Sequence, residues 1–436
     1  MMHTRCLLLF PLAIAAFAHQ PPPLQLTLKD AVALALKQNP QVILANLGVE
    51  RSEQGRLVAR SALLPQVGGN VSELQHRVNL QTALGISFPG LPQHVGPFEV
   101  FQIGAQFQAP VFDLTLWRRY KASQIGVEAS RSGEMTARED SVLLVVSQYL
   151  GSQRAAANVQ TVLSQVELAQ ALYDLAADLQ KNGVGTGIDT LRANVQLQNQ
   201  KQLLIQARTG LDTALFGLSR LLNLDPRQQI QLADQVSFSD TQSVPMDQAL
   251  DRAYAARPEL KQLGYQMQQS ELALRAAGES RYPKLTASGN WLQQGLTPAS
   301  VIPVYNYQIS LDLPLFTGGR IEAERTDADL AIRQLQQRQQ ELRNRVAQEV
   351  KTAVAQLDAA RSEVEVANLG VALAKQEVEQ ARDRFQAGVV NNIEVITAQD
   401  ELARAGNNQI GALYRYNQAR ADLAHAEGQM EAVYGR

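Results

Sequence analysis

The chain has 436 residues, a formal net charge of −2 and a hydrophobic content of 45%, with only 6% aromatic residues. A charge this close to zero excludes a nucleic-acid-binding polycation and an acidic disordered tail. The low aromatic content suits long packed helices better than a conventional globular core. The length alone permits two or three domains.

The first 18 residues are predicted to be a secretory signal peptide. Arg5 supplies the positive charge, Cys6–Phe17 the apolar region, and Ala16–Ala18 the small residues of a cleavage site. A membrane anchor is the alternative, but the apolar run is too short to span a bilayer, and no longer uncharged apolar run follows elsewhere. We therefore expect cleavage near Ala18 and a mature chain without cysteine or lipid attachment, because Cys6 is the only cysteine.

The sequence contains the same order of elements twice. Helices are predicted at 26–38 and 40–64, and a second such pair begins near Met246. The prolines that open and close the longer helix recur at a constant offset, because Pro40 and Pro258 are 218 positions apart and so are Pro65 and Pro283. An internal duplication is the simplest explanation. The predicted copies are residues 19–232 and 233–436.

After each closing proline the hydrophobic period changes to two. Strands are predicted at about 66–79, 98–110, 284–294 and 304–315. In the last strand Tyr305, Tyr307 and Ile309 alternate with Asn306 and Gln308. A half-buried soluble strand is the commoner alternative. Strands of about ten residues with one apolar and one uncharged polar face are, however, typical of membrane β-barrels, and four strands cannot close a barrel without further copies of the chain.

Each copy continues into a long helical hairpin, at 114–222 and 319–430. The first arm of the second hairpin has a heptad seam in which large residues and alanines alternate. Its members are Val346, Val350, Ala353, Leu357, Ala360, Val364, Ala367, Val371, Ala374, Val378, Ala381 and Phe385. With about 1.5 Å per residue the arm is about 100 Å long, so the hairpin must project. The predicted fold is mixed and mainly α, with duplicated hairpins and four strands.

Two short segments form the tips of these hairpins. They comprise Gly183, Val184, Gly185, Thr186 and Gly187, and Gly388, Val389, Val390, Asn391 and Asn392. Glycines here reverse the chain and expose backbone to a partner. A phosphate loop is excluded, because no strand precedes the glycines and no lysine follows in the required place. Asp189 is expected either to cap the returning helix or to act in gating or docking.

No catalytic group of residues is recognisable in the sequence. The five histidines are scattered without a short-spaced pair, and the six methionines do not cluster. We therefore expect no enzymatic activity, no cofactor, no metal and no nucleic-acid partner.

The duplicated order of helix, strand pair and long hairpin resembles the TolC family of outer-membrane efflux channels. The segments between the strand pair and the hairpin of each copy, Ala109–Asp113 and Leu313–Arg320, also resemble this family. The tip Gly183–Asp189 is similar to the family's Gly-Val-Gly-Thr-x-x-Asp signature. The resemblance implies a homotrimer in which each chain gives four strands to one twelve-stranded barrel in outer-membrane lipid. It also implies a periplasmic tunnel, a periplasmic adaptor and an inner-membrane pump as partners, and exported solutes or proteins as substrates.

The resemblance also suggests charged residues at the tunnel entrance. Glu394 stands at a matching acidic position, whereas Thr397 follows one turn later, so we expect a weaker cation-selective ring than two acidic layers would give. Asp189 and Glu394 are expected to pair with basic groups such as Arg192 on neighbouring hairpins. Two alternatives are a periplasmic adaptor, which would lack the duplicated strand pairs, and a helical scaffold, which would not need lipid-facing strands.

Overall fold

The structure is a computed structural model that describes residues 22–435 except 81, 83–84, 86–89, 91, 235–243 and 388. The expected signal peptide, part of the loop at 80–97, and Gly388 lie outside the described residues. Within the described ranges, no helix has the length and apolarity needed to cross a bilayer.

The helices occur in the same order in both halves of the chain. The first half contains α1 (Leu28–Gln38), α2 (Pro40–Ser61), α4 (Leu114–Lys181) and α5 (Gly187–Leu221). The second half contains α6 (Met246–Ala256), α7 (Pro258–Glu279), α8 (Arg320–Gln386), α9 (Asn392–Ala426) and the short α10 (Met430–Tyr434). Local capping fixes several starts. Thr27 forms a capping box with Asp30, Asn39 caps α2 ahead of Pro40, and Asp113 accepts from the backbone N–H groups of Thr115 and Leu116.

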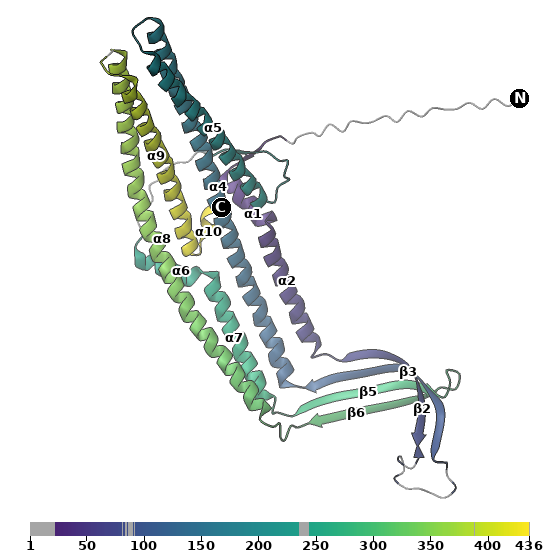
Figure 1. Cartoon of the computed structure of the whole chain (residues 1–436). Helices are drawn as coiled ribbons and strands as arrows, with labels where there is room; N and C mark the ends of the chain where they lie inside the picture. The colour runs from purple at the N-terminus through teal and green to yellow at the C-terminus, as the bar shows by residue number, and fades with distance from the viewer. Residues whose placement is uncertain are drawn as a thin grey trace, which may run out of the picture.

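The two hairpins lie side by side, with their tips at one end of the molecule and the sheet at the other (Figure 1). Helix α4 contacts α2 and α5 of its own half and α7 and α9 of the other half. Helix α8 contacts α6, α7 and α9, which all belong to its own half. Helices α4 and α8, with 68 and 67 residues, therefore each run about 100 Å and connect the tips to the sheet.

Four strands form one antiparallel sheet in the order β2-β3-β5-β6. Their bounds are β2 (Gln66–Asn79), β3 (His94–Phe112), β5 (Lys284–Gly295) and β6 (Ile302–Asp312). Strand β3 is longer than the predicted 98–110, because His94–Val100 pair with β2 beyond the end of β5. It also continues through Pro110, where a register shift accommodates the missing N–H. Strand β6 starts two residues before the predicted 304–315 and ends three residues earlier.

A second, small sheet lies near the middle of the molecule. Strand β1 (Leu24–Leu26) pairs in parallel with β4 (Ile230–Leu232), joining the start of the described chain to the segment between the two halves. The hydroxyl of Tyr149 on α4 donates to the carbonyl of Leu26 at 2.9 Å and to the carboxylate of Asp234 at 3.0 Å. Burial is the main cause that raises the pKa of Tyr149, and it keeps the hydroxyl protonated as a donor.

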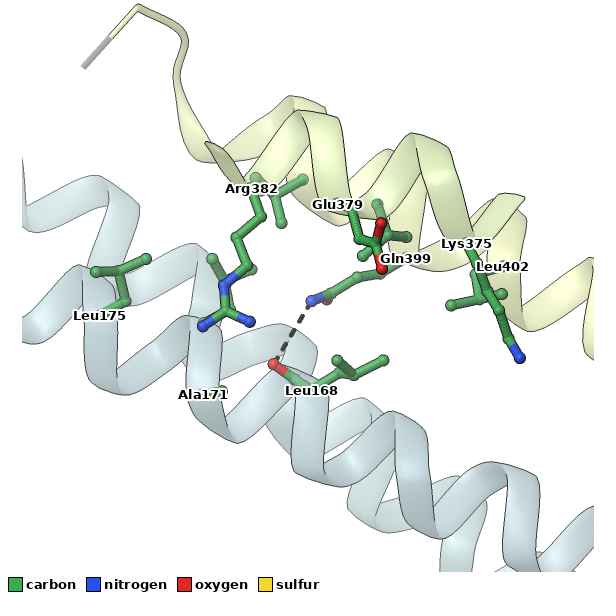
Figure 2. Close-up of a pocket in the computed structure, with 11 residues that line it drawn as sticks. Leu168, Ala171, Leu175, Lys375, Glu379, Arg382, Gln399 and Leu402 are labelled. Atoms are coloured by element: carbon green, nitrogen blue, oxygen red, sulfur yellow. Dashed lines mark hydrogen bonds between the residues drawn. The ribbon is translucent and has the colours of Figure 1, made fainter. Parts of the chain in front are cut away.

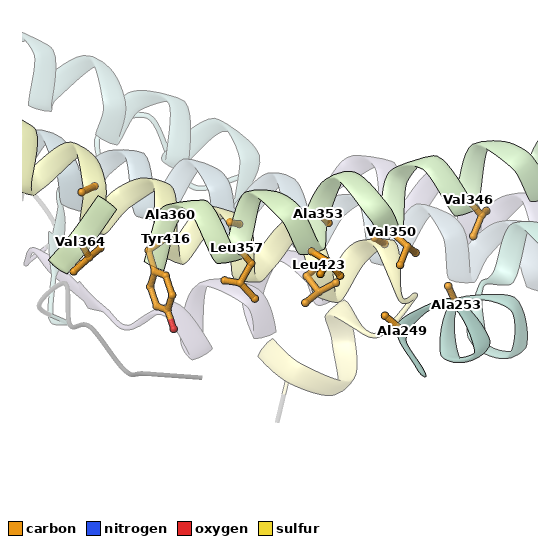
Figure 3. Close-up of a cluster of buried hydrophobic side chains, with 14 residues drawn as sticks. Ala249, Ala253, Val346, Val350, Ala353, Leu357, Ala360, Val364, Tyr416 and Leu423 are labelled. Carbon is orange, nitrogen blue, oxygen red and sulfur yellow. The ribbon is translucent and has the colours of Figure 1, made fainter. Parts of the chain in front are cut away.

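The predicted heptad seam is confirmed as the core of the second hairpin. Eleven of its twelve members are buried, and Ala367 is partly buried against the same cluster. Figure 3 shows Val346, Val350, Ala353 and Leu357 of α8 pointing toward the short helix α6 and the returning α9. Alanines at alternate seam positions let the helix backbones approach closely. A larger side chain at such a position must displace its neighbours.

Enlarging one of these alanines should destabilise the hairpin. Ala374 is 7% exposed, so Ala374→Leu should cost about 1–3 kcal/mol of unfolding free energy through overpacking. Gln376, two residues further along, is exposed and provides the matched control as Gln376→Leu. Urea unfolding followed by circular dichroism measures both variants. Equal loss in the two would contradict the seam assignment.

Charged side chains join the end of α9 to α6, α7 and α8. The buried Arg257 donates through Nε to the carbonyl of Ala426 at 2.9 Å and pairs with Glu349 and Glu259. Beside it, Glu427 lies 3.2 Å from Arg252 with only 6% of its side chain exposed. Burial raises the pKa of Glu427 and outweighs the lowering by Arg252. The ionised carboxylate is therefore penalised in the folded chain.

A raised pKa stabilises the fold at low pH, and that stabilisation is lost as the pH rises through the folded-state pKa. Glu427→Gln removes the ionised group, so its melting temperature at neutral pH should exceed that of the wild type, and the difference should shrink in acid. Glu431 is the control, because its hydrogen bond with Arg138 lowers its pKa. Glu431→Gln should lower the neutral-pH melting temperature, and its deficit should shrink as the pH falls. Melting curves between acid and neutral pH would contradict this account if both variants changed in the same direction.

Candidate functional site: the hairpin tips

The first tip is a tight reversal that follows the end of α4. Gly183 has a φ of +74°, a backbone conformation that a residue with a side chain adopts only with strain. The backbone N–H groups of Val184 and Gly185 both donate to the carbonyl of Leu179, at 3.0 and 2.9 Å. These bonds satisfy a carbonyl that the helix end would otherwise leave open.

Gly185 is required by this turn for steric reasons. A Cβ at this position would lie 2.9 Å from the Cβ of Leu179 and 3.0 Å from the backbone nitrogen of Gln180. A substitution at Gly185 therefore disturbs the turn as well as any docking contact. Val184 is 76% exposed and Val389 of the second tip is 69% exposed, so these side chains report on docking more cleanly.

The second tip is tied to the first by Asn392. Its side chain is fully buried, and its Nδ2 donates to the carbonyl of Asp189 at 2.8 Å. Asn391 caps α9 by accepting from the N–H of Ile393 at 3.1 Å. Sequence reasoning assigned Asn392 only to the exposed docking tip. The heptad pattern could have predicted that Asn392 is buried, because position 392 lies three residues before the seam residue Val395.

The three charged residues predicted at the tunnel entrance, Asp189, Arg192 and Glu394, differ in the partners that they contact. Glu394 pairs with Arg384 of its own hairpin at 2.6 Å, and Asp189 accepts a hydrogen bond from the hydroxyl of Thr186 near the start of α5. Across the described part of the chain, Arg192 forms no ion pair. Pairing of Arg192 with an acidic residue of another chain stays a prediction.

A groove between α5 and α9 begins at the tips. Its lining is mostly apolar and comprises Ile188, Leu191, Arg192, Val195, Gln196, Ile393 and Ile396. One turn further from the tips, Gln196 donates through Nε2 to the carboxylate of Asp400 at 2.9 Å and bridges the two helices. This bond and the Asn392 contact add to a buried apolar cluster that joins the two hairpins, in which Leu172, Ala176 and Ala193 pack with Val378, Ala381, Phe385, Val395 and Ala398.

A second groove lies between α4 and the α8–α9 hairpin (Figure 2). Leu168, Ala171 and Leu175 lie on its α4 side, whereas Lys375, Glu379 and Arg382 contribute charge from α8. Figure 2 shows Gln399 reaching from α9 to the carbonyl of Leu168, at 3.5 Å. Grooves with apolar floors and polar rims of this kind can accept the side chains of a helical partner.

In the ranges that the structure covers, no three histidine, cysteine, aspartate or glutamate side chains converge as possible ligands of a metal ion. His425 is mostly buried, and its Nε2 lies 2.8 Å from Oδ1 of Asp140.

Comparison with known proteins identifies the family of this architecture. The family model described as "Outer membrane efflux protein" matches residues 31–224 and 249–429. The chain belongs to the outer membrane efflux protein family. This membership indicates an outer-membrane location with a periplasmic part, and it supports a channel and not an adaptor or a scaffold. The family is one of channels, so no enzymatic role is indicated.

Individual relatives are distant but extend along most of the chain. The alkaline protease secretion protein AprF of Pseudomonas aeruginosa is 23% identical over 422 residues, which cover 93% of this chain and 85% of AprF. The pyoverdine export outer membrane protein OpmQ of the same species is 23% identical, covering 87% of this chain and 80% of OpmQ. The crystal structure of the Campylobacter jejuni CmeC outer membrane channel has a TM-score of 0.80 at 19% identity, covering 92% of this chain and 85% of CmeC. The fold is thus that of TolC-like channels.

The Arg384–Glu394 pair provides a test of the tip charges. Glu394→Gln removes a negative charge and frees Arg384, so it should reduce cation selectivity or raise single-channel conductance. Glu401→Gln is the matched control, because Glu401 forms a similar exposed pair with Arg404 on the same helix but farther from the tip. Reversal potentials and conductance across planar bilayers measure the effect. Indistinguishable shifts in the two variants would contradict a special role for Glu394.

Proposed function

We propose that this protein is the outer-membrane channel of a tripartite efflux or type I secretion system, and that it conducts substrates passively from a periplasmic adaptor and an inner-membrane pump to the exterior. The observation that carries this proposal is the two-faced sheet joined to helices about 100 Å long. The sheet suits a lipid bilayer, and the helices suit a tunnel that extends from it.

One face of the sheet is apolar and exposed. Cross-strand register places Val67, Phe107 and Tyr307 in one row, and Ala105, Trp291 and Tyr305 in the next. Trp291, Tyr305 and Tyr307 are each more than half exposed and contact one another in tilted ring pairs. Exposed aromatic and aliphatic rows of this kind would be unfavourable in water but suit lipid. The opposite face carries amides and hydroxyls in the rows of Thr286, Ser288 and Asn290 and becomes apolar at Leu292, Val304 and Ile302, and its polar rows suit a water-filled interior.

The unpaired edges support a homotrimer. Among the described residues, strands β2 and β6 each have one neighbour in the sheet, so each leaves one row of its backbone groups without a partner there. Edge-to-edge pairing between copies satisfies these groups and closes the barrel. The helices carry matching unpartnered stripes, because Val366, Leu369 and Leu373 are exposed on α8, and Ile188, Leu191, Val195 and Ile205 are exposed on α5. In the trimer these stripes pack on neighbouring chains.

The partners follow from the distance between the tips and the sheet. With the sheet in the outer membrane, the tips Gly183–Gly187 and 388–392 are the parts of the chain that lie farthest into the periplasm. They provide docking surfaces for the adaptor, while Asp189, Arg192 and Glu394 influence the entrance. The substrate is a small molecule or a protein, since AprF is named for protease secretion and OpmQ for pyoverdine export. Residues 1–18 act as the cleaved signal peptide, without lipid attachment, and 19–232 and 233–436 form the two repeats.

Charging the exposed tip residues tests docking. Val184→Glu combined with Val389→Glu should abolish export, because a buried carboxylate in the adaptor interface costs several kcal/mol unless it is paired. Trimer formation and membrane insertion should be unchanged, because both side chains are exposed in the chain.

Val433→Glu is the matched control, since Val433 is 52% exposed on α10, far from the tips. The measurements are export by cells, trimer mass in detergent, and cross-linking of the adaptor to the tips. Normal export by the double tip variant would contradict the docking assignment.

A further inference from the structure

The polar face of the sheet carries rows of carboxamides without charge. Register places Gln66, Gln108, Ser288 and Gln308 in one row, and Gly68, Gln106, Asn290 and Asn306 in the next. A hollow over the sheet is lined mainly by these side chains. Because the hollow lies on the polar side, that side is the concave one and faces the interior when the barrel closes.

Most of these carboxamides are free to bind a solute. Within the described chain, Gln106, Gln108, Asn290 and Asn306 make no side-chain hydrogen bond, and Gln106, Gln108 and Asn306 are exposed. Each carboxamide has two N–H donors and a carbonyl acceptor, so it can bind a partner in either orientation. In a closed trimer the two rows would repeat three times around the interior.

Charge is excluded from this face along most of its length. At the end near the helices Lys284 lies opposite Asp312 and forms an ion pair with Asp113 at 3.3 Å, so one positive and two negative side chains gather there. From Thr286 to Gln294 of β5, and across the rows that these residues define, every side chain on this face is neutral. On this face the next titratable side chain toward the outer end is His76 of β2, because Glu73 and Glu99 alternate onto the opposite face. The helix tips differ, because Arg382, Arg384 and Glu394 gather there.

We infer that the barrel section of this channel recognises substrates by hydrogen bonding to carboxamides, and that its substrate class is extended polypeptide irrespective of side-chain charge. The inference rests on the proposed channel function and deepens it. Peptide groups are themselves amides. The carboxamides of the lining can therefore replace water as their hydrogen-bond partners. A ring of fixed charges would instead retain segments of opposite charge and repel segments of like charge. Selection between positively and negatively charged substrates would then take place only at the hairpin tips.

Residence times of peptides in single channels test this inference. Peptides of equal length that carry lysine, glutamate or serine side chains are added from the barrel side of a planar bilayer. In the wild type all three should block for similar times. Gln106→Leu combined with Gln308→Leu should shorten all three residence times, because the amide partners are lost. Ile309→Leu, on the opposite face of β6, is the control and should change none.

Charged substitutions complete the test. Gln106→Glu combined with Gln308→Glu should lengthen the block by lysine peptides and shorten the block by glutamate peptides, each by about tenfold if the added charges contribute about 1.4 kcal/mol. Wild-type residence times that already differ tenfold between the two charged peptides would overturn the inference, as would residence times unchanged by the leucine substitutions. Absence of any conductance in the wild type would instead overturn the proposed function.

Discussion

The packing of small and large side chains along the hairpin seams is the constraint on which this structure depends. An isolated helix of about 100 Å has no core of its own, so its stability must come from the apolar stripe that it buries against neighbours. In α8 the stripe runs from Val346 to Phe385 with alanine at alternating positions. Close approach of the backbones makes the arm stiff enough to hold the tips at a fixed distance from the sheet.

The sheet imposes a second constraint, which a single chain cannot satisfy. Its apolar face is exposed, and its edges at β2 and β6 have no partners within the described part of the chain. A bilayer satisfies the exposed face, and further copies satisfy the edges. The same assembly also covers the unpartnered stripes of α5 and α8. One arrangement of copies therefore resolves the open surfaces of both the sheet and the helices.

Periodic features were predictable from the sequence, because each is repeated over many residues. The seam residues, the alternating faces of β5 and β6, and the recurrence of Pro40 at Pro258 all belong to this class. The length of β3 was not predictable, because its outer end pairs only with β2 and lacks an apolar face. The three-residue pairing of β1 with β4 is too short to give any periodic signal.

At the tips, sequence reasoning identified the turn but not its internal bonds. The contact between Asn392 and the backbone of Asp189 joins positions about 200 residues apart through a single side chain. The pairing of Glu394 with Arg384 depends on how the two arms are rotated about the turn. Neither relation follows from local spacing. The duplication aligns Asn392 with Gly187 and so shows that the two positions are equivalent in the two tips. It does not show that the side chain of Asn392 bonds to the other tip.

The assembly of copies through β2 and β6 is the central claim, and disulfide cross-linking tests it most directly. Within one chain these strands are separated by β3 and β5, about 14 Å at ordinary strand spacing, which is too far for a disulfide. Asn70→Cys on β2 is combined in turn with cysteine at Asn306, Gln308 or Ser310 on β6, and the membranes are oxidised and run on non-reducing gels. The account predicts that at least one pair gives a covalent species with the mass of three chains. Monomers alone, or a ladder that passes beyond three chains, would contradict it.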